Sequence, residues 1–258
     1  MRLIDSHAHL DDARFDIDRA EALSAFEALG GVAAIVPAIN PANWQAVRDI
    51  TSRDKRLFAA YGIHPMFSGD LTDQNLISLE QWLSVTPAVA VGECGLDYVV
   101  GDDDRERQNR FFHQQLMLAR KRALPVIVHD RKATDDILKQ INQTHHHHGV
   151  VHSFAGSYQQ AQRLIDAGYC LGFGGAATHQ RAQKLQRLIK QLPLDALLLE
   201  TDSPYQPPVG HKGERNQPAL LVDILDLFER CRSESREEIA NITSDNAIRL
   251  FNLPISTQ

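Results

Sequence analysis

Short apolar segments alternate with amphipathic helical segments along the chain, and this alternation most constrains the possible folds. The apolar segments are nearly continuous in hydrophobic character, as is typical of strands buried on both faces of a parallel sheet. Helical spacing of apolar residues follows each of them. The predicted strands are residues 3–4, 32–36, 57–61, 88–92, 125–128, 149–151, 169–173 and 196–199. The predicted helices are residues 16–29, 41–50, 72–83, 103–122, 133–141, 158–167, 182–191, 219–231 and 235–252.

Eight strand and helix units in 258 residues predict an α/β fold, a single TIM-type (β/α)₈ barrel, regular or distorted, with extra C-terminal helices. An open, doubly wound sheet is the alternative, because it shares the same alternation. Nothing resembling a linker divides the chain, so residues 1–258 are expected to form one domain.

Net charge, cysteine spacing and hydrophobic pattern narrow the classes of function that we expect for this chain. The net charge of −6 does not favour general binding to phosphate backbones, so contacts to a nucleic acid would have to be local. The three cysteines follow no zinc or disulfide spacing, and no signal peptide or membrane span is recognised. We therefore expect a cytoplasmic protein without membrane association, and no obligate protein partner is indicated.

Polar residues that can bind metal follow the predicted strands where those strands end. In a (β/α)₈ barrel these ends share one face, where active sites are built. Four imidazoles and two carboxylates converging there would be costly to bury without metal, and they suffice for two ions with open positions. Any one of these histidines alone would more readily be a structural residue. The residues are His7, His9, Glu93, His129, His152 and Asp202.

Seven sequence blocks carry a resemblance to a known family. They are Asp5-Ser6-His7-Ala8-His9-Leu10-Asp11, Gly62-Ile63-His64-Pro65, Gly92-Glu93-Cys94-Gly95-Leu96-Asp97-Tyr98, Pro125-Val126-Ile127-Val128-His129-Asp130-Arg131, His152-Ser153-Phe154-Ala155-Gly156, Leu199-Glu200-Thr201-Asp202-Ser203-Pro204-Tyr205 and Gly213-Glu214-Arg215-Asn216-Gln217-Pro218. In sequence and in order, over nearly the whole chain, these blocks resemble the TatD-type metal-dependent hydrolases of the amidohydrolase superfamily, and within them the YjjV-type branch.

The resemblance implies a site for two divalent ions. By matching position, His7, His9 and Asp202 would hold the first ion. The second would be held by His129 and His152. Glu93 would bridge the two, since a carboxylate has two oxygens. Imidazole ligands suit zinc, manganese or iron, whereas the family suggests magnesium, so the identity of the metal stays open.

Further residues receive expected roles. Asp202 would orient the attacking water and take its proton, while Glu200, two residues earlier, would support it or handle protons. His64 could hold a substrate phosphate. Arg131 and Arg215 could do the same through forked hydrogen bonds, although a surface ion pair explains each arginine nearly as well.

The resemblance implies a deoxyribonuclease that hydrolyses phosphodiester bonds of DNA or oligonucleotides, usually from the 3′ end. One alternative keeps the site but acts on a small molecule, by hydrolysis of a lactone or cyclic amide or by deamination. Another is a metal-loaded barrel that only binds a partner. A closed structural zinc site needs four ligands, and this chain offers more, which favours the enzyme.

Overall fold

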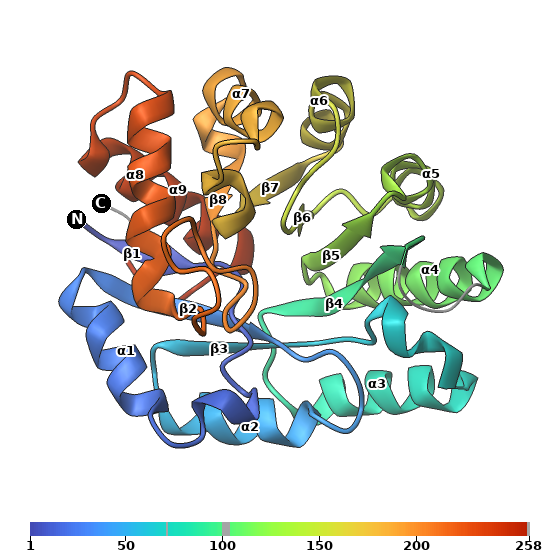
Figure 1. Cartoon of the computed structure of the whole chain (residues 1–258). Helices are drawn as coiled ribbons and strands as arrows, with labels where there is room; N and C mark the ends of the chain where they lie inside the picture. Colours follow the sequence, from blue (N-terminus) through green and yellow to red (C-terminus); the bar gives the residue numbers. More distant parts are fainter. Residues whose placement is uncertain (71, 100–103, 257–258) are drawn as a thin grey trace.

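The computed structural model describes residues 1–70, 72–99 and 104–256. Eight parallel strands pair in sequence order, from β1 to β8, and the helices surround them (Figure 1). The strands are β1 (Leu3–Asp5), β2 (Gly31–Pro37), β3 (Leu57–Tyr61), β4 (Ala90–Asp97), β5 (Val126–Arg131), β6 (Gly149–Val151), β7 (Tyr169–Phe173) and β8 (Leu197–Leu199). The helices are α1 (Arg19–Ala28), α2 (Trp44–Arg53), α3 (Asp73–Val85), α4 (Arg105–Arg122), α5 (Thr134–Thr144), α6 (Tyr158–Asp166), α7 (Gln183–Gln191), α8 (Leu221–Cys231) and α9 (Arg236–Phe251).

The sheet closes where the chain after β1 meets the chain after β8. The Ser6 amide donates to the Leu199 carbonyl at 3.0 Å, and the Asp202 amide donates to the His7 carbonyl at 2.9 Å. The His9 amide donates to Ser203 at 2.7 Å. The predicted (β/α)₈ barrel is therefore confirmed, and the open sheet is excluded. Closure also brings the predicted ligands that follow β1, His7 and His9, next to Asp202, the predicted ligand that follows β8.

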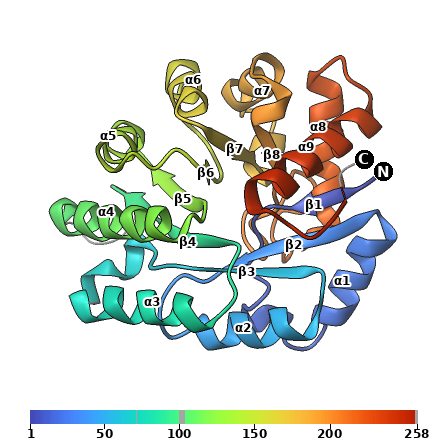
Figure 2. The ribbon, with the colours of Figure 1, turned by 180° about the vertical axis from the view of Figure 1, so that it is seen from behind.

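Apolar side chains fill one half of the barrel interior. Ile35, Ile127 and Leu198 point inward from their strands and belong to one buried cluster with Phe251 of α9. Figure 2 shows the barrel from behind, with α9 lying against β8 and β1. A larger cluster fills the space between the strands and the outer helices. The apolar floor leaves the opposite half, at the carboxyl ends of the strands, to polar side chains.

Strand β4 differs most from the prediction. It was expected to end at Gly92, but it continues through Glu93 to Asp97. A bulge between Val91 and Cys94 shifts the register, and the rest of β4 pairs with β5 up to Asp97 and Arg131. The polar Glu93 marks a change of register rather than the end of the strand. As a result, β4 extends into the polar half of the barrel.

Helix starts follow local capping chemistry. Ser157 and Gln160 form a capping box at α6, and Ser235 and Glu238 form another at α9. The helix expected from residue 16 begins only at Arg19. The expected start of another helix at Asp103 lies outside the described residues.

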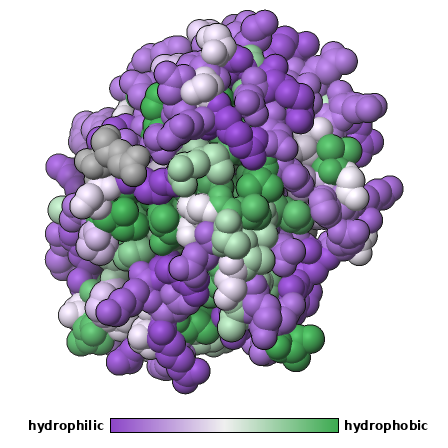
Figure 3. All heavy atoms as spheres, turned by 90° about the vertical axis from the view of Figure 1, so that its left-hand side faces the viewer, coloured by the Kyte–Doolittle hydropathy of each residue, from purple (hydrophilic) through white to green (hydrophobic). Residues whose placement is uncertain are grey.

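The surface is mainly hydrophilic on the side that carries both chain ends. Figure 3 shows this side, with apolar side chains gathered in a band near its centre. Residues near the two ends of the chain are in contact, since Arg2 donates to the Ser256 carbonyl at 2.5 Å. None of the helices in the described part of the chain has the length and apolar character needed to cross a bilayer.

Candidate metal centre and active site

The segment after β1 delivers two imidazoles to the same point. His7 and His9 are two residues apart in extended backbone, so both rings face the barrel axis. Their Nε2 atoms lie 3.2 Å apart. On the other ring edge of His9, Nδ1 lies 3.2 Å from the carbonyl of Pro37. That contact fixes the ring and leaves Nε2 directed at the centre of the site.

Glu93 lies between two groups of imidazoles. Its Oε2 lies 3.2 Å from His7 Nε2 and 3.5 Å from His9 Nε2. Its Oε1 lies 2.8 Å from His152 Nε2, 3.1 Å from His129 Nδ1 and 3.2 Å from His64 Nε2. The two oxygens of one buried carboxylate thus face different sets of nitrogen atoms.

His129 faces Glu93 with a different ring nitrogen from the other histidines, which all use Nε2. Its Nδ1 faces Glu93, while its Nε2 lies 3.0 Å from Asp97 Oδ2. Asp97 is buried and comes from the extension of β4, and its pairing with His129 was not predicted. Residues 93, 95 and 97 share one face of the strand, so the alternation past Glu93 was the available signal.

Asp202 follows β8 in a left-handed backbone conformation, with φ of 56°. Asp tolerates this region better than most residues, and such conformations gather at functional sites. Its Oδ1 lies 3.5 Å from His9 Nε2 and 3.7 Å from His7 Nε2. Its Oδ2 accepts a hydrogen bond from Gln206 Nε2 at 2.5 Å, and the same amide lies 2.9 Å from Ser153 Oγ. Gln206 comes from an irregular loop and no sequence pattern pointed to it.

Glu200 lies behind this group and is fully buried. Its Oε1 accepts the Ser153 amide at 2.5 Å and lies 3.8 Å from His152 Nδ1. Its other oxygen lies against Gly172, where any Cβ would overlap it. Burial raises the pKa of Glu200 to about 7. The residue can therefore hold or release a proton near neutral pH.

Charge in the site is distributed unevenly. Burial lowers the pKa of His7 to about 4, helped by the nearby His152. Burial works in the same direction on His9 and His129, but their hydrogen bonds to carboxylates, and the negative charge of those carboxylates, outweigh it and raise the pKa of each to about 9. Burial works against ionisation of Asp202, yet its hydrogen bond with His9 lowers its pKa to about 2. Against the effect of burial, the pKa of Glu93 is likewise held well below its ordinary value by the surrounding histidines, so Glu93 and Asp202 are ionised at neutral pH and attract cations.

The remaining predicted residues lie at different distances from the centre. His64 is buried with its Nε2 among the other imidazoles. Arg131 is exposed and lines the cavity over the site. Arg215 does not line that cavity, since both terminal nitrogens contact Asp18, at 2.6 and 2.7 Å. The ion pair weighed for Arg215 from the sequence is thus present.

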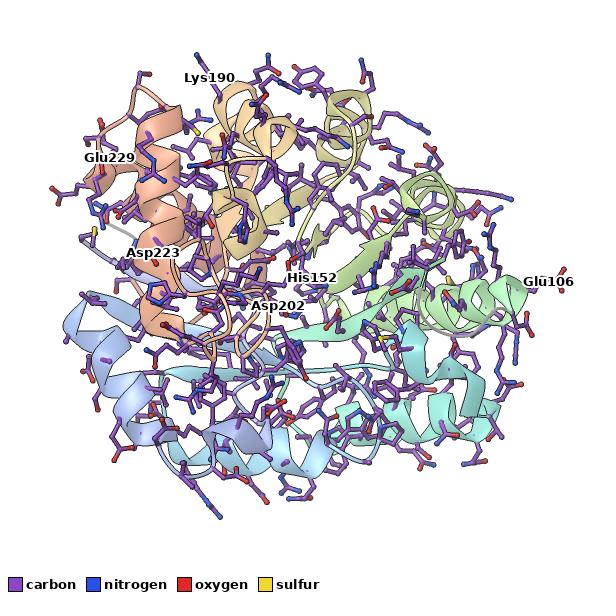
Figure 4. All side chains as sticks on the ribbon, viewed as in Figure 1. Glu106, His152, Lys190, Asp202, Asp223 and Glu229 are labelled. Carbon is purple, nitrogen blue, oxygen red and sulfur yellow. The ribbon has the colours of Figure 1, made fainter. Side chains whose placement is uncertain are left out.

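The cavity over the site has a volume of about 700 Å³. Figure 4 shows Asp202 and His152 near the centre of the barrel, with Glu106, Lys190 and Glu229 at the periphery. Glu93 is only 2% exposed and lies at the bottom. The upper wall carries apolar side chains. They are Ile39, Met66, Phe67, Leu185 and Tyr205.

The donor set fits divalent metal. Three groups of side chains each bring their nitrogen and oxygen ligand atoms within 4.8 Å of one another: His7, Glu93 and His152; His7, His9 and Asp202; and His64, Glu93 and His129. Imidazole nitrogens and carboxylate oxygens are the ligands of zinc and related ions in hydrolases. The site also keeps open access from the cavity, as a catalytic metal centre requires.

Comparison with known proteins identifies the family. The sequence profile of the TatD related DNase family matches residues 4–252. This chain belongs to the TatD family. The metal-dependent hydrolase YjjV of Escherichia coli is 38% identical over 98% of this chain and 99% of its own length. The metal-dependent hydrolase YabD of Bacillus subtilis is 31% identical over 97% and 99%.

Solved structures agree with that membership. The crystal structure of E. coli YjjV, a TatD homologue, matches with a TM-score of 0.94 over 98% of this chain and 99% of that one, at 38% identity. A TatD family hydrolase from Entamoeba histolytica matches with a TM-score of 0.86 over 97% and 98%, at 22% identity, which shows the shared fold. The chain is therefore a TatD family metal-dependent hydrolase with a TIM-type barrel.

Proposed function

We propose that this chain is a deoxyribonuclease that hydrolyses phosphodiester bonds at a centre for two divalent ions. The arrangement of Glu93 supports the proposal most directly, because its two oxygens face two separate imidazole groups. His7, His9 and Asp202 would hold one ion, and His129 and His152 the other. His64, whose Nε2 also faces Glu93, lies where it could assist the second group.

When bound, the ions would lower the pKa of a water molecule and offset charge on the phosphate oxygens. Asp202 would accept the proton of the attacking water, held in place by the amide of Gln206. Glu200, whose Oε1 lies 3.8 Å from His152 Nδ1, would exchange protons near neutral pH. Arg131 at the cavity wall would hold a substrate phosphate. Digestion from the 3′ end is the polarity that family membership suggests.

The test uses protein stripped of metal and reloaded with magnesium, manganese or zinc. We expect laddering of an end-labelled single-stranded oligonucleotide, restored by at least one ion. Asp202→Asn should lower the rate at least a hundredfold. Asp223→Asn on α8 is the matched control, since that carboxylate does not line the cavity. Protein that binds two ions but cleaves nothing would refute the nuclease proposal.

A hydrolase of small molecules is the second candidate, and the apolar upper wall of the cavity favours it. Exposed Met66 and Tyr205, with the partly buried Ile39 and Phe67, offer surface to an uncharged ring. A panel of lactones and cyclic amides, assayed with the same reloaded protein, would separate the two. Turnover of one of these without cleavage of the oligonucleotide would favour the second candidate.

A further inference from the structure

The cavity over the metal centre continues into two side cavities, which we call the first and second arms. The first arm has a volume of about 420 Å³ and shares Asp130, Arg131 and Ala155 with the central cavity. The second arm has a volume of about 770 Å³ and shares Ala176 and Gln206 with it. Because each arm shares wall residues with the centre, the three spaces form one groove along the carboxyl ends of β5 to β8.

Cations without acidic partners border both arms. Arg131 and Lys132 are exposed at the first arm, and Arg181 and Lys212 are exposed at the second. None of these four side chains forms an ion pair with any residue in the described part of the chain. Elsewhere on the surface many arginines are paired, as Arg215 is with Asp18. In a chain of net charge −6, four unpaired cations along one groove indicate a polyanionic ligand.

The acidic side chains that line the arms already have hydrogen-bond or ion-pair partners within the protein. At the first arm, Asp135 pairs with Arg163 at 3.1 Å, and Asp136 accepts the Tyr98 hydroxyl at 2.7 Å. Asp130 accepts the Thr134 hydroxyl and the Ala133 amide. The second arm has no acidic side chain among its described lining residues. Hydrogen bonds from neutral groups leave the charge of Asp136 and Asp130 in place, so the first arm carries charge of both signs, whereas the charge of the second arm is positive.

We propose that a single polynucleotide strand crosses the metal centre, with backbone phosphates held in both arms. This inference rests on the proposed phosphodiesterase function and adds to it. Glu93 lies at the cavity floor with 2% exposure, so a scissile phosphate must descend into the groove, which an unpaired strand can do. A site that cleaves only the terminal bond needs to bind the strand on one side of the scissile phosphate. The second arm gives room beyond that bond, so internal bonds are also substrates.

Paired substitutions test each arm. The variants are R131Q/K132Q for the first arm, R181Q/K212Q for the second, and R187Q/K190Q on α7 as the control of equal charge. The control residues line neither arm, and Figure 4 places Lys190 at the periphery. Glutamine keeps much of the side-chain length, so the change is mainly one of charge. The probes are a twelve-nucleotide oligothymidylate and bis(p-nitrophenyl) phosphate.

Salt dependence gives the expected magnitudes. With four phosphate contacts, kcat/KM on the oligonucleotide should fall about 50-fold between 50 and 200 mM salt, and with two contacts only about sevenfold. Each arm variant should show the smaller fall, and the α7 control the larger. At low salt, each arm variant should lose more on the oligonucleotide than on the small diester. A single-stranded DNA circle should be opened.

Three results would overturn the inference. They are an arm variant with the salt dependence of the wild type, equal losses on both probes, and a circle that stays intact while linear strands are cut. Failure of the proposed function itself looks different, because the wild type would then hydrolyse neither the oligonucleotide nor the small diester with any ion.

Discussion

Loading the metal-free protein with divalent ions should release about two protons per chain at pH 7. A metal binds only the neutral imidazole, and the pKa of both His9 and His129 is raised to about 9 in the metal-free site. Both rings are thus protonated at pH 7. His7, with a pKa of about 4, and Asp202, with a pKa of about 2, have already lost theirs. The pKa of His152 is also raised, so it can add a further fraction.

The sign of the pH dependence follows from competition between protons and metal. Each displaced proton contributes a factor of ten per pH unit, so overall affinity for the ions should rise about 100-fold from pH 7 to pH 8. The rise should flatten above pH 9, where His9 and His129 are neutral without metal. Below pH 6, binding should be weak.

Calorimetric titration in two buffers of different ionisation enthalpy, such as PIPES and Tris, counts the protons directly. Asp97→Asn is the informative variant, because the hydrogen bond with Asp97 helps to raise the pKa of His129. It should release about one proton fewer and bind metal roughly 10- to 100-fold more weakly. Release of less than one proton by the wild type would refute the assignment of charge in the site.

Three substitutions test the surroundings of the site. Gly172→Ala would place a Cβ against Glu200 Oε2. It should cost about 1–3 kcal/mol of unfolding free energy and lower kcat, and a variant with wild-type values would show that Glu200 can move freely. Phe251→Ala should cost about 3–5 kcal/mol in urea denaturation, because this ring closes the apolar floor, and a loss below 1 kcal/mol would contradict that role. Ser235→Ala should cost about 0.5–2 kcal/mol through the lost cap of α9, and an unchanged denaturation midpoint would argue against it.

The barrel could be predicted because its strands are continuous in hydrophobic character and each is followed by a helix. The same logic brought His7, Glu93, His152 and Asp202 together, since they follow strands that share one face. Their use as ligands stays a prediction. What the structure adds is the orientation of each ring, such as the Nδ1 atom that His129 turns toward Glu93.

The residues missed by sequence reasoning lie where local patterns carry little information. Asp97 was missed because Glu93 looked like the end of a strand, whereas a bulge lets β4 continue. Gln206 reaches Asp202 from a loop whose path depends on tertiary contacts. Strand register places Asp97 and loop conformation places Gln206. Both depend on the whole fold, and for this reason local sequence patterns did not reveal these two residues.

The apolar floor and the polar rim of the barrel have a consequence for how such proteins diverge. Phe251 and the inward-facing residues of the strands pack into a cluster of their own, which includes none of the candidate ligands at the strand ends. A mutation at the rim therefore changes chemistry while most of the folding energy stays in place. Descendants of one ancestral barrel can thus exchange ligands or loops one at a time, with a folded protein at every generation.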